Sequence, residues 1–223
     1  MDTVQERLAA AAGRVVRHPV IVFGAGRTDA GVHAEGQVAN FYTTNFAVPM
    51  VGLRRAINSR LPYDIAVRSA VEVDEVFHAS RSATGKTYRY RLHIATQRCV
   101  ARHRQVYHFD RSLDVHRMRL GAARLLGTHD FRGFATSAEA RENTVRTVFR
   151  CDVSEHDDEL HVTVQGDGFL YNMVRNIVGT LVEIGRGRWE ADQVDLALTT
   201  RDRKHAGPTA PAQGLSLLCV HYA

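Results

Sequence analysis

Apolar residues recur at helical spacing in five stretches of the chain, and short β-branched runs lie between them. The first stretch begins with Thr3-Val4-Gln5-Glu6, a capping-box pattern, and therefore predicts a helix from Thr3. The other four predict helices over residues 51–61, 114–126, 170–184 and 191–199. Strands are predicted over residues 20–23, 37–43, 64–73, 86–95, 144–155, 159–165 and 215–222. These elements predict an α+β protein with a mixed, mostly antiparallel central sheet flanked by helices.

The predicted elements divide into two halves that pack together, because no low-complexity segment or clear linker separates them. The first half, residues 1–110, contains a polar, glycine-rich loop over residues 24–36 and a strand with a Tyr-Arg-Tyr sequence. The second half, residues 111–223, contains an apolar helix that carries an arginine. Each of these three segments holds side chains that could take part in chemistry.

The composition is that of a soluble globular protein, with 44% hydrophobic and 24% charged residues. No apolar run approaches the roughly 20 residues that a membrane-spanning helix needs, so no membrane partner is predicted. The formal charge is +5, and all but Lys86 and Lys204 of the 29 basic residues are arginine. Two interpretations stay open: a proteome-wide codon preference, or recognition of phosphate by planar guanidinium groups.

Cysteine and histidine follow no pattern that is typical of a metal site. Cys99, Cys151 and Cys219 are odd in number and widely spaced, which argues against a disulfide framework or a zinc site. The 12 histidines include no H-E-x-x-H or H-x-H sequence. Unpaired thiols are typical of a reducing compartment, and the N-terminus lacks a basic-then-apolar signal pattern. The cytoplasm is therefore the predicted location.

The loop over residues 24–36 places an arginine and an aspartate two residues apart, Arg27 and Asp29, among residues with very small side chains. The glycine spacing fits neither of the common phosphate-binding motifs. In an extended backbone both side chains would point to the same side. A neighbouring guanidinium keeps a carboxylate ionised, as a nucleophilic aspartate requires. The alternative is a turn with a local ion pair.

The strand over residues 86–95 alternates aromatic and basic side chains. Tyr88 and Tyr90 share one face, and Arg89 and Arg91 share the other. Aromatic rings stack on bases and arginines neutralise phosphates, so the pattern fits an RNA-binding strand. A half-buried strand with a solvated basic face would show the same pattern.

The apolar helix over residues 170–184 carries one arginine. Its core-facing stripe is predicted to consist of Val174, Ile177, Val178 and Leu181. Arg175 falls on another face together with Asn172, Asn176 and Gly179, and Gly179 is expected to leave room beside the arginine. A guanidinium in such a place is costly unless it meets an anion, which an active site or a structural ion pair would supply equally well.

Taken in order, these segments resemble the motifs of the TruA-type tRNA pseudouridine synthases. The most characteristic match is Gly26-Arg27-Thr28-Asp29-Ala30-Gly31-Val32-His33-Ala34, followed by Gly36-Gln37-Val38. Later matches, in the same order as in the family, are Phe77-His78-Ala79, Ser82-Ala83-Thr84 with the Tyr-Arg-Tyr strand, Met173-Val174-Arg175-Asn176-Ile177-Val178-Gly179 and Gly207-Pro208-Thr209-Ala210-Pro211. The resemblance covers the chain from about Thr3 to Tyr222. It implies the pseudouridine synthase fold, with two pseudo-symmetric halves.

The resemblance also implies a function for individual residues. Asp29 matches the nucleophile that attacks the target uridine at the sugar C1′ or at C6 of the base, and Arg175 matches the arginine that pairs with it. Tyr88 matches the tyrosine that packs on the base, and its phenol could also remove the proton from C5. Arg27 matches the arginine that holds the target nucleotide out of its stack, which is physically reasonable because a flipped base loses its stacking. The family needs no metal ion and no organic cofactor.

The expected activity is isomerisation of uridine to pseudouridine at positions 38–40 in the anticodon stem-loop of tRNA. The resemblance further implies a homodimer in which one tRNA contacts both subunits. The arginines expected to neutralise phosphates are Arg54, Arg55, Arg102, Arg104, Arg186 and Arg188.

One departure from the family is expected to matter. Its members usually open with a strand and a Gly-Trp-Gln-type segment before the helix that begins here at Thr3, so the first strand of the fold is expected to be missing. A misassigned start codon, a truncated polypeptide and a natural short form would each explain this. Two other functions stay open: a catalytically weak tRNA-binding or chaperone protein, and a hydrolase. A hydrolase usually needs a second carboxylate, for which Glu35 is the nearest candidate.

Overall fold

A computed structural model describes residues 3–45, 49–136, 139 and 141–223 of the protein. Its residue contacts group into two compact units. The N-terminal unit consists of Met1–Arg27, Gln37–Ala83 and Ala223, and the sheet unit consists of Thr28–Gly36 and Thr84–Tyr222. The glycine-rich loop is therefore divided, and its aspartate belongs to the sheet unit. The expected boundary near residue 110 between two pseudo-symmetric halves stays a prediction.

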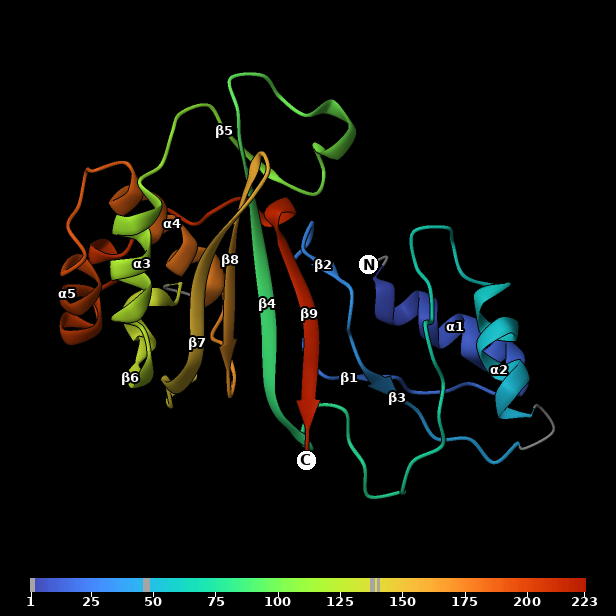
Figure 1. Ribbon diagram of the computed structural model, residues 1–223. Coiled ribbons are helices and arrows are strands. Elements are labelled where there is room, and N and C mark those ends of the chain that lie inside the picture. The colour runs from blue at the N-terminus through green and yellow to red at the C-terminus, as the bar shows by residue number, and fades with distance from the viewer. Residues whose placement is uncertain (1–2, 46–48, 137–138, 140) are drawn as a thin grey trace. The chain divides into compact units, whose positions relative to one another are not determined.

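Two helices form the core of the N-terminal unit (Figure 1). Helix α1 (Val4–Val16) begins at the predicted capping box: Thr3 Oγ1 accepts from the Glu6 backbone N at 3.2 Å, and the Glu6 carboxylate accepts from the Thr3 backbone N at 3.0 Å. Helix α2 (Met50–Asn58) packs against α1. The buried residues of this core are Ala11, Ala12, Val15, Leu53 and Ile57.

The strands of the N-terminal unit are shorter than predicted. Strands β1 (Phe23–Gly24) and β3 (Ala39–Asn40) form a two-stranded antiparallel sheet in place of longer strands over residues 20–23 and 37–43.

The predicted strand over residues 64–73 is wrong, because these residues form no strand. The side chain of Asn58 bonds both backbone groups of Val67, at 2.7 Å to its N–H and at 2.9 Å to its carbonyl oxygen. These bonds satisfy polar groups that a neighbouring strand would otherwise have to satisfy.

The sheet unit is built on one sheet, which has seven strands when counted over the described residues (Figure 1). The strands follow the order β2-β9-β4-β8-β7-β6, and β5 pairs with one end of β4. Their bounds are β2 His33–Ala34, β4 Ala83–Ile94, β5 Tyr107–Phe109, β6 Gly127–Asp130, β7 Val145–His156, β8 Glu159–Gly166 and β9 Leu215–Tyr222. The pairs β4/β8, β7/β8 and β6/β7 are antiparallel, whereas β2/β9 and β4/β5 are parallel. This confirms the prediction of a mixed, mostly antiparallel sheet.

The alternation of side chains along β4 follows the predicted pattern. Tyr88 and Tyr90 are 9% and 0% exposed, while Arg89 and Arg91 on the other face are half-buried. The tyrosine face therefore turns inward. Strands β7 and β8 form the predicted hairpin.

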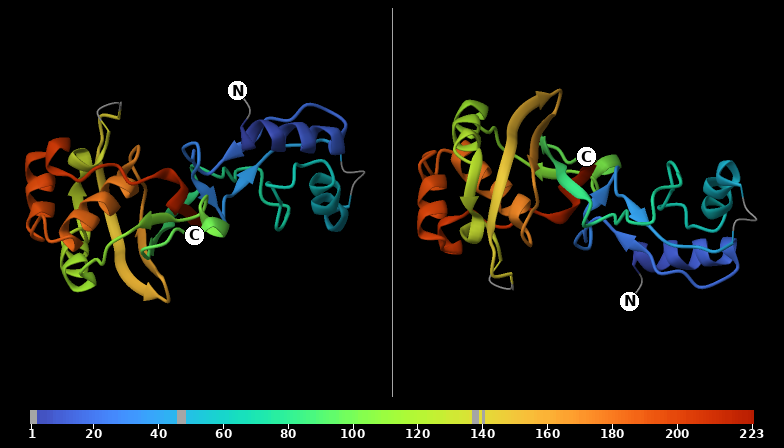
Figure 2. Two further views of the ribbon diagram at one scale, coloured as in Figure 1. Left: turned by 90° about the horizontal axis from the view of Figure 1, so that it is seen from above. Right: turned by 90° about the horizontal axis from the view of Figure 1, so that it is seen from below.

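Three helices accompany the sheet. Helix α3 (Val115–Ala123) packs against β7 and against α4 (Met173–Gly185), and α5 (Gln193–Thr200) completes the group, which Figure 2 shows on one side of the sheet. The predicted core stripe of α4 is confirmed, because all four of its members are buried. Short 3₁₀ helices are η1 Val100–Arg102, η2 Phe131–Phe134, η3 Arg203–His205 and η4 Ala212–Gly214. Within the described ranges, none of the helices has the length and apolar character required to cross a membrane.

The structure differs from the sequence-based predictions at two glycines. The helix predicted over residues 114–126 ends at Ala123, and Gly127, with φ +98, begins β6. Gly179 does not serve to leave room beside Arg175. A Cβ atom on Gly179 would lie 1.7 Å from the carbonyl oxygen of Pro208, so its role is to let the backbone of the loop before β9 touch α4 directly.

Gly179→Ala should lower the free energy of unfolding by about 3 kcal/mol, because the Pro208 backbone cannot yield to a methyl group without leaving the helix. At an open helix position the same change would raise that free energy by up to about 1 kcal/mol, so the sign is diagnostic. Urea unfolding measures the difference.

Gly121→Ala in α3 is a matched control. A Cβ atom there would meet Ile184 Cδ1 at 2.8 Å and Leu181 Cδ2 at 3.1 Å, the ends of side chains that can rotate. Gly121→Ala should lower the free energy of unfolding by less than about 1.5 kcal/mol. Equal losses in the two variants would contradict the close approach at Gly179.

Candidate active site

The carboxylate of Asp29 is carried by a tight turn of the sheet unit. The carbonyl oxygen of Asp29 accepts from the Val32 backbone N at 3.0 Å, and Gly31 between them has φ +85, a conformation that favours glycine. The chain then enters β2, which runs parallel to β9 with His33 opposite Ser216. The side chain of Asp29 is 28% exposed, so it is accessible from solvent.

Strand β2 is held closely against β9. The backbone N–H groups of Glu35 and Gly36 both donate to the carbonyl oxygen of Leu217, at 2.8 and 3.1 Å. A Cβ atom on Gly36 would lie 2.1 Å from the carbonyl oxygen of Leu218, so a glycine is required for this approach. Because β2 directly follows the turn, its pairing with β9 fixes where the carboxylate lies.

Arg175 lies against this carboxylate. From the first turn of α4, its Nη1 atom is 3.0 Å from Asp29 Oδ2. The same nitrogen donates to Asn172 Oδ1 at 2.6 Å, and Nε donates to the carbonyl oxygen of Ala210 at 2.7 Å. The Arg175 side chain is only 16% exposed, so solvent screens the ion pair less than it screens a surface pair.

The segment over residues 207–211 is fastened along α4. The Gly207 backbone N donates to Thr180 Oγ1 at 2.8 Å, and Thr209 Oγ1 donates to Asn176 Oδ1 at 2.7 Å. These bonds fix the loop whose carbonyl oxygen receives the Nε bond of the arginine.

Tyr90 braces the same segment from the sheet. It is fully buried, and its hydroxyl donates to the carbonyl oxygen of Pro211 at 2.7 Å. A Cβ atom on Gly214 would lie 2.6 Å from the Tyr90 ring, so the glycine makes room for this contact.

Tyr88 extends from β4 to the site. Its ring packs edge-on against Phe169, with ring centroids 5.3 Å apart and an interplanar angle of 88°. Burial raises the pKa of Tyr88 to about 12, and the negative charge of Asp29 adds to the shift. The phenol is therefore neutral at physiological pH, and it is close enough to Asp29 for that charge to act on it.

Two further residues were singled out from the sequence. Arg27 belongs to the N-terminal unit, where its side chain is exposed, and its predicted action on the target nucleotide stays a prediction. Glu35, the candidate second carboxylate, accepts from Ser216 Oγ at 3.3 Å.

Two residues of the site were not predicted as functional. Phe169 stands in the connection between β8 and α4, where no periodic pattern marks it. For Asn172 a signal existed: asparagine is one of the few residues besides glycine that readily adopt a left-handed backbone, and it stands where α4 begins.

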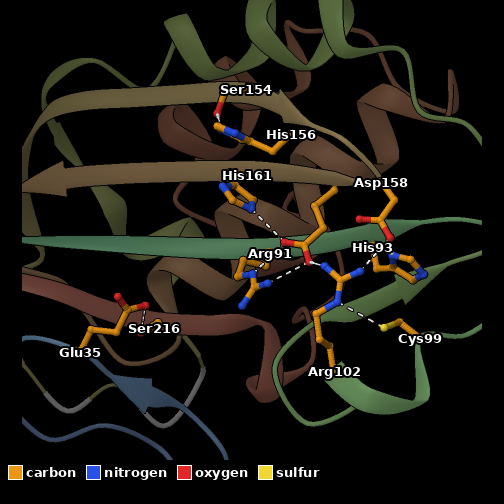
Figure 3. A network of polar contacts seen from close by, with 11 residues as sticks. Glu35, Arg91, His93, Cys99, Arg102, Ser154, His156, Asp158, His161 and Ser216 are labelled. Carbon is orange, nitrogen blue, oxygen red and sulfur yellow. Dashed lines mark hydrogen bonds and ion pairs between the residues drawn. The ribbon is translucent and has the colours of Figure 1, made fainter.

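A second charged cluster, also unpredicted, lies on β4 and β8 (Figure 3). The Glu159 carboxylate is 4% exposed and accepts from Arg91 Nε and Nη2 at 2.7 and 2.8 Å. It also contacts His161 Nε2 at 2.9 Å and the guanidinium of Arg102, which in turn bonds Asp158 at 2.7 Å. Although burial opposes ionisation, these hydrogen bonds and charges hold the pKa of Glu159 at about 2. The cluster ties η1 to the sheet.

Among the residues that the structure describes, no group of three or more histidine, cysteine, aspartate or glutamate side chains is placed to hold a metal ion. All three cysteines are free thiols.

Known proteins are similar to this chain over most of its length. A family model described as tRNA pseudouridine synthase matches residues 122–223. A tRNA pseudouridine synthase A of Exiguobacterium sibiricum is 44% identical over 99% of this chain and 87% of the relative. Proteins of the same name from Brevibacillus brevis and Acetivibrio thermocellus are 45% and 43% identical, each over 99% of this chain and 90% of the relative. The chain belongs to the tRNA pseudouridine synthase A family.

Family membership confirms the resemblance seen in the sequence, and the observed α+β architecture is consistent with the pseudouridine synthase fold. The relatives carry the name of a synthase, which gives no support to a weak binding or chaperone protein.

Within this family context, the structure distinguishes the arginines expected to contact phosphates. Arg102 forms ion pairs with the carboxylates of Asp158 and Glu159. Arg186 and Arg188 both form ion pairs with Glu183 of α4, at 2.8 and 3.1 Å. Arg54, Arg55 and Arg104 are exposed, and Arg54 Nη1 donates to the carbonyl oxygen of Arg68 at 3.2 Å. A guanidinium already paired with a carboxylate offers less charge to a phosphate, so Arg54, Arg55 and Arg104 are the stronger candidates among the six. Which of them contact tRNA stays a prediction.

Tyr88 should keep its proton well beyond pH 10. Ultraviolet titration of the wild type and of Tyr88→Phe should therefore show equal phenolate absorbance up to about pH 11, because the pKa of Tyr88 is raised to about 12. As the pH rises from about 10 to about 12, the unfolded chain releases this proton first, so the stability contributed by the neutral phenol is lost over that window. If the wild type instead showed one more phenolate than Tyr88→Phe, with a midpoint near pH 10, the raised pKa of Tyr88 would be contradicted.

Glu159→Gln should lower the free energy of unfolding at pH 7 by about 2 kcal/mol. Breaking a fully buried ion pair costs more than this, but the two arginines that pair with Glu159 are partly exposed, so solvent weakens the interaction. The pKa of Glu159 is lowered from 4.5 to about 2, so its contribution is complete above about pH 4.5 and is lost as the pH falls towards 2. The difference in free energy of unfolding between the wild type and Glu159→Gln, measured by urea unfolding, should therefore be smaller at pH 3 than at pH 7.

Glu155→Gln serves as its control, because that carboxylate is 65% exposed and lies 3.6 Å from Arg119. Its effect should stay within about 0.5 kcal/mol. A Glu159→Gln protein as stable as this control at pH 7 would show that the cluster does not stabilise the fold.

Proposed function

We propose that this protein converts uridine to pseudouridine at positions 38–40 in the anticodon stem-loop of tRNA, with Asp29 as the nucleophile. As a member of the tRNA pseudouridine synthase A family, it is an isomerase that acts on RNA uridine. The observation that carries the assignment of Asp29 is its contact of 3.0 Å with Arg175, a residue 146 positions away in sequence. A neighbouring guanidinium favours the charged form of a carboxylate, and that form is the nucleophile.

Asp29 attacks the target uridine at the sugar C1′ or at C6 of the base. The bond between N1 and C1′ breaks, the uracil rotates in the site, and a bond forms between C5 and C1′. C5 loses its proton, N1 gains one, and the aspartate is released as a carboxylate. Reactant and product contain the same atoms and electrons, so the reaction requires no redox partner or group donor.

Tyr88 packs on the base in this proposal. The sequence also allowed its phenol to remove the proton from C5. With a pKa of about 12, only roughly one molecule in 10⁵ carries the phenolate at pH 7. A neutral phenol is a poor base, so packing is the function that the environment of Tyr88 favours.

The remaining parts of the proposal follow from the family resemblance. Arg27 keeps the target nucleotide out of its stack. The protein acts in the cytoplasm as a homodimer in which one tRNA contacts both subunits. The free thiols are in keeping with a reducing compartment, and the formal charge of +5 suits a polyanionic partner.

Release of tritium from C5-labelled uridine in tRNA tests the proposal. The wild type should release tritium, whereas Asp29→Ala should release it at least about 10³-fold more slowly, because the covalent step is lost. Binding of tRNA should change by no more than a few fold. Asp110→Ala, which removes a carboxylate that is 68% exposed, is the matched control and should react at the wild-type rate.

The outcomes separate the alternatives. Equal release by the wild type and Asp29→Ala would rule out the nucleophile. Binding of tRNA without release by the wild type would indicate a binding protein, and free uracil as the product would indicate a hydrolase.

A further inference from the structure

We infer that Asn172 is a positioning residue, which holds the guanidinium of Arg175 against Asp29. The inference rests on the proposed function of Asp29 and adds a residue to the same site. Asn172 Oδ1 accepts from Arg175 Nη1 at 2.6 Å, and that nitrogen is also the one that lies 3.0 Å from Asp29 Oδ2. A single nitrogen thus connects the amide to the carboxylate.

The backbone explains why an asparagine stands at this position. Asn172 is the N-cap residue of α4 and has φ 60 and ψ 7, a left-handed conformation that asparagine tolerates better than most residues. An N-cap side chain ordinarily accepts from the backbone of the first helical turn, but that of Asn172 makes no such bond. Its amide oxygen is directed to Arg175 instead.

The turn that carries Asn172 is anchored from outside the site. Glu139, whose side chain is 5% exposed, accepts from the Tyr171 backbone N at 2.8 Å, and the carbonyl oxygen of Tyr171 accepts from the Thr136 backbone N at 3.3 Å. Phe169, which packs on Tyr88, belongs to the same connection between β8 and α4. One short segment therefore presents both an aromatic ring and an amide to the reacting region.

A neutral amide suits this position better than a carboxylate. A second carboxylate at Asn172 would compete with Asp29 for the guanidinium and would disfavour the charged form of Asp29 by repulsion. The amide oxygen accepts from Nη1 without adding charge. Because Nε is bonded to the carbonyl oxygen of Ala210, the guanidinium is held at two of its nitrogens and keeps its orientation.

Two substitutions distinguish the effect of losing the amide acceptor from the effect of straining the backbone. Asn172→Gly and Asn172→Ala both remove the acceptor, but only glycine adopts the left-handed conformation without strain. We expect kcat for pseudouridine formation to fall about tenfold or more in both variants, as for other lost hydrogen bonds to a charged group. The Kd for tRNA should stay within about twofold, and Asn172→Ala should lower Tm further than Asn172→Gly, because alanine adds backbone strain to the lost hydrogen bond. Wild-type kcat in Asn172→Gly would overturn the inference.

Asn172→Asp provides a readout that a merely structural residue would not change. It retains an acceptor and adds a negative charge beside Asp29, so the acid limb of the kcat profile should move to higher pH by about one unit. An unchanged pH profile would count against the positioning of Arg175 by this side chain.

Assays of the wild type and Asp29→Ala in parallel distinguish this inference from the proposed function. If Asp29→Ala is as active as the wild type, the proposed function of Asp29 fails and the inference fails with it. If Asp29→Ala is inactive while Asn172→Gly retains wild-type kcat, only the inference on Asn172 fails.

Discussion

The guanidinium of Arg175 connects three segments that are distant in sequence: the turn at Asp29, its own helix α4, and the loop at Ala210. Hydrogen bonds from a charged donor are stronger than neutral ones, and the low exposure of this side chain limits screening by solvent. Without the guanidinium, a partly buried carboxylate would lose its counter-ion and a loop carbonyl would lose its donor. The nucleophile and the loop beside it are thus held by the same group.

That connection depends on how closely α4 approaches the loop. Gly179 and Gly207 face each other, and a Cβ atom on Gly207 would lie 2.5 Å from the carbonyl carbon of Gly179. The contact gives a physical reason why these two glycines, far apart in the chain, both stand in motifs of the family. Their function is to bring two backbones together, and the charged side chains are then placed by that contact.

Local patterns predicted much of the fold, because capping boxes and hairpins are encoded within a few residues. The strand over residues 64–73 could not be excluded in this way, since a side chain outside it, Asn58, bonds its backbone. The resemblance pointed to Asp29 and Arg175, but their contact is a tertiary feature. Glu159 follows two aspartates at a hairpin turn and looks solvated in the sequence; only the fold buries it between two arginines.

The parallel pairing of β2 with β9 has a consequence for how the protein is made. Contacts across this pair join Glu35 to Ser216, 181 residues later in the chain. Pairings of such separation form slowly, and synthesis delivers the earlier segments first. During synthesis on the ribosome, β2 and the turn that bears Asp29 therefore stay unpaired until β9 has emerged.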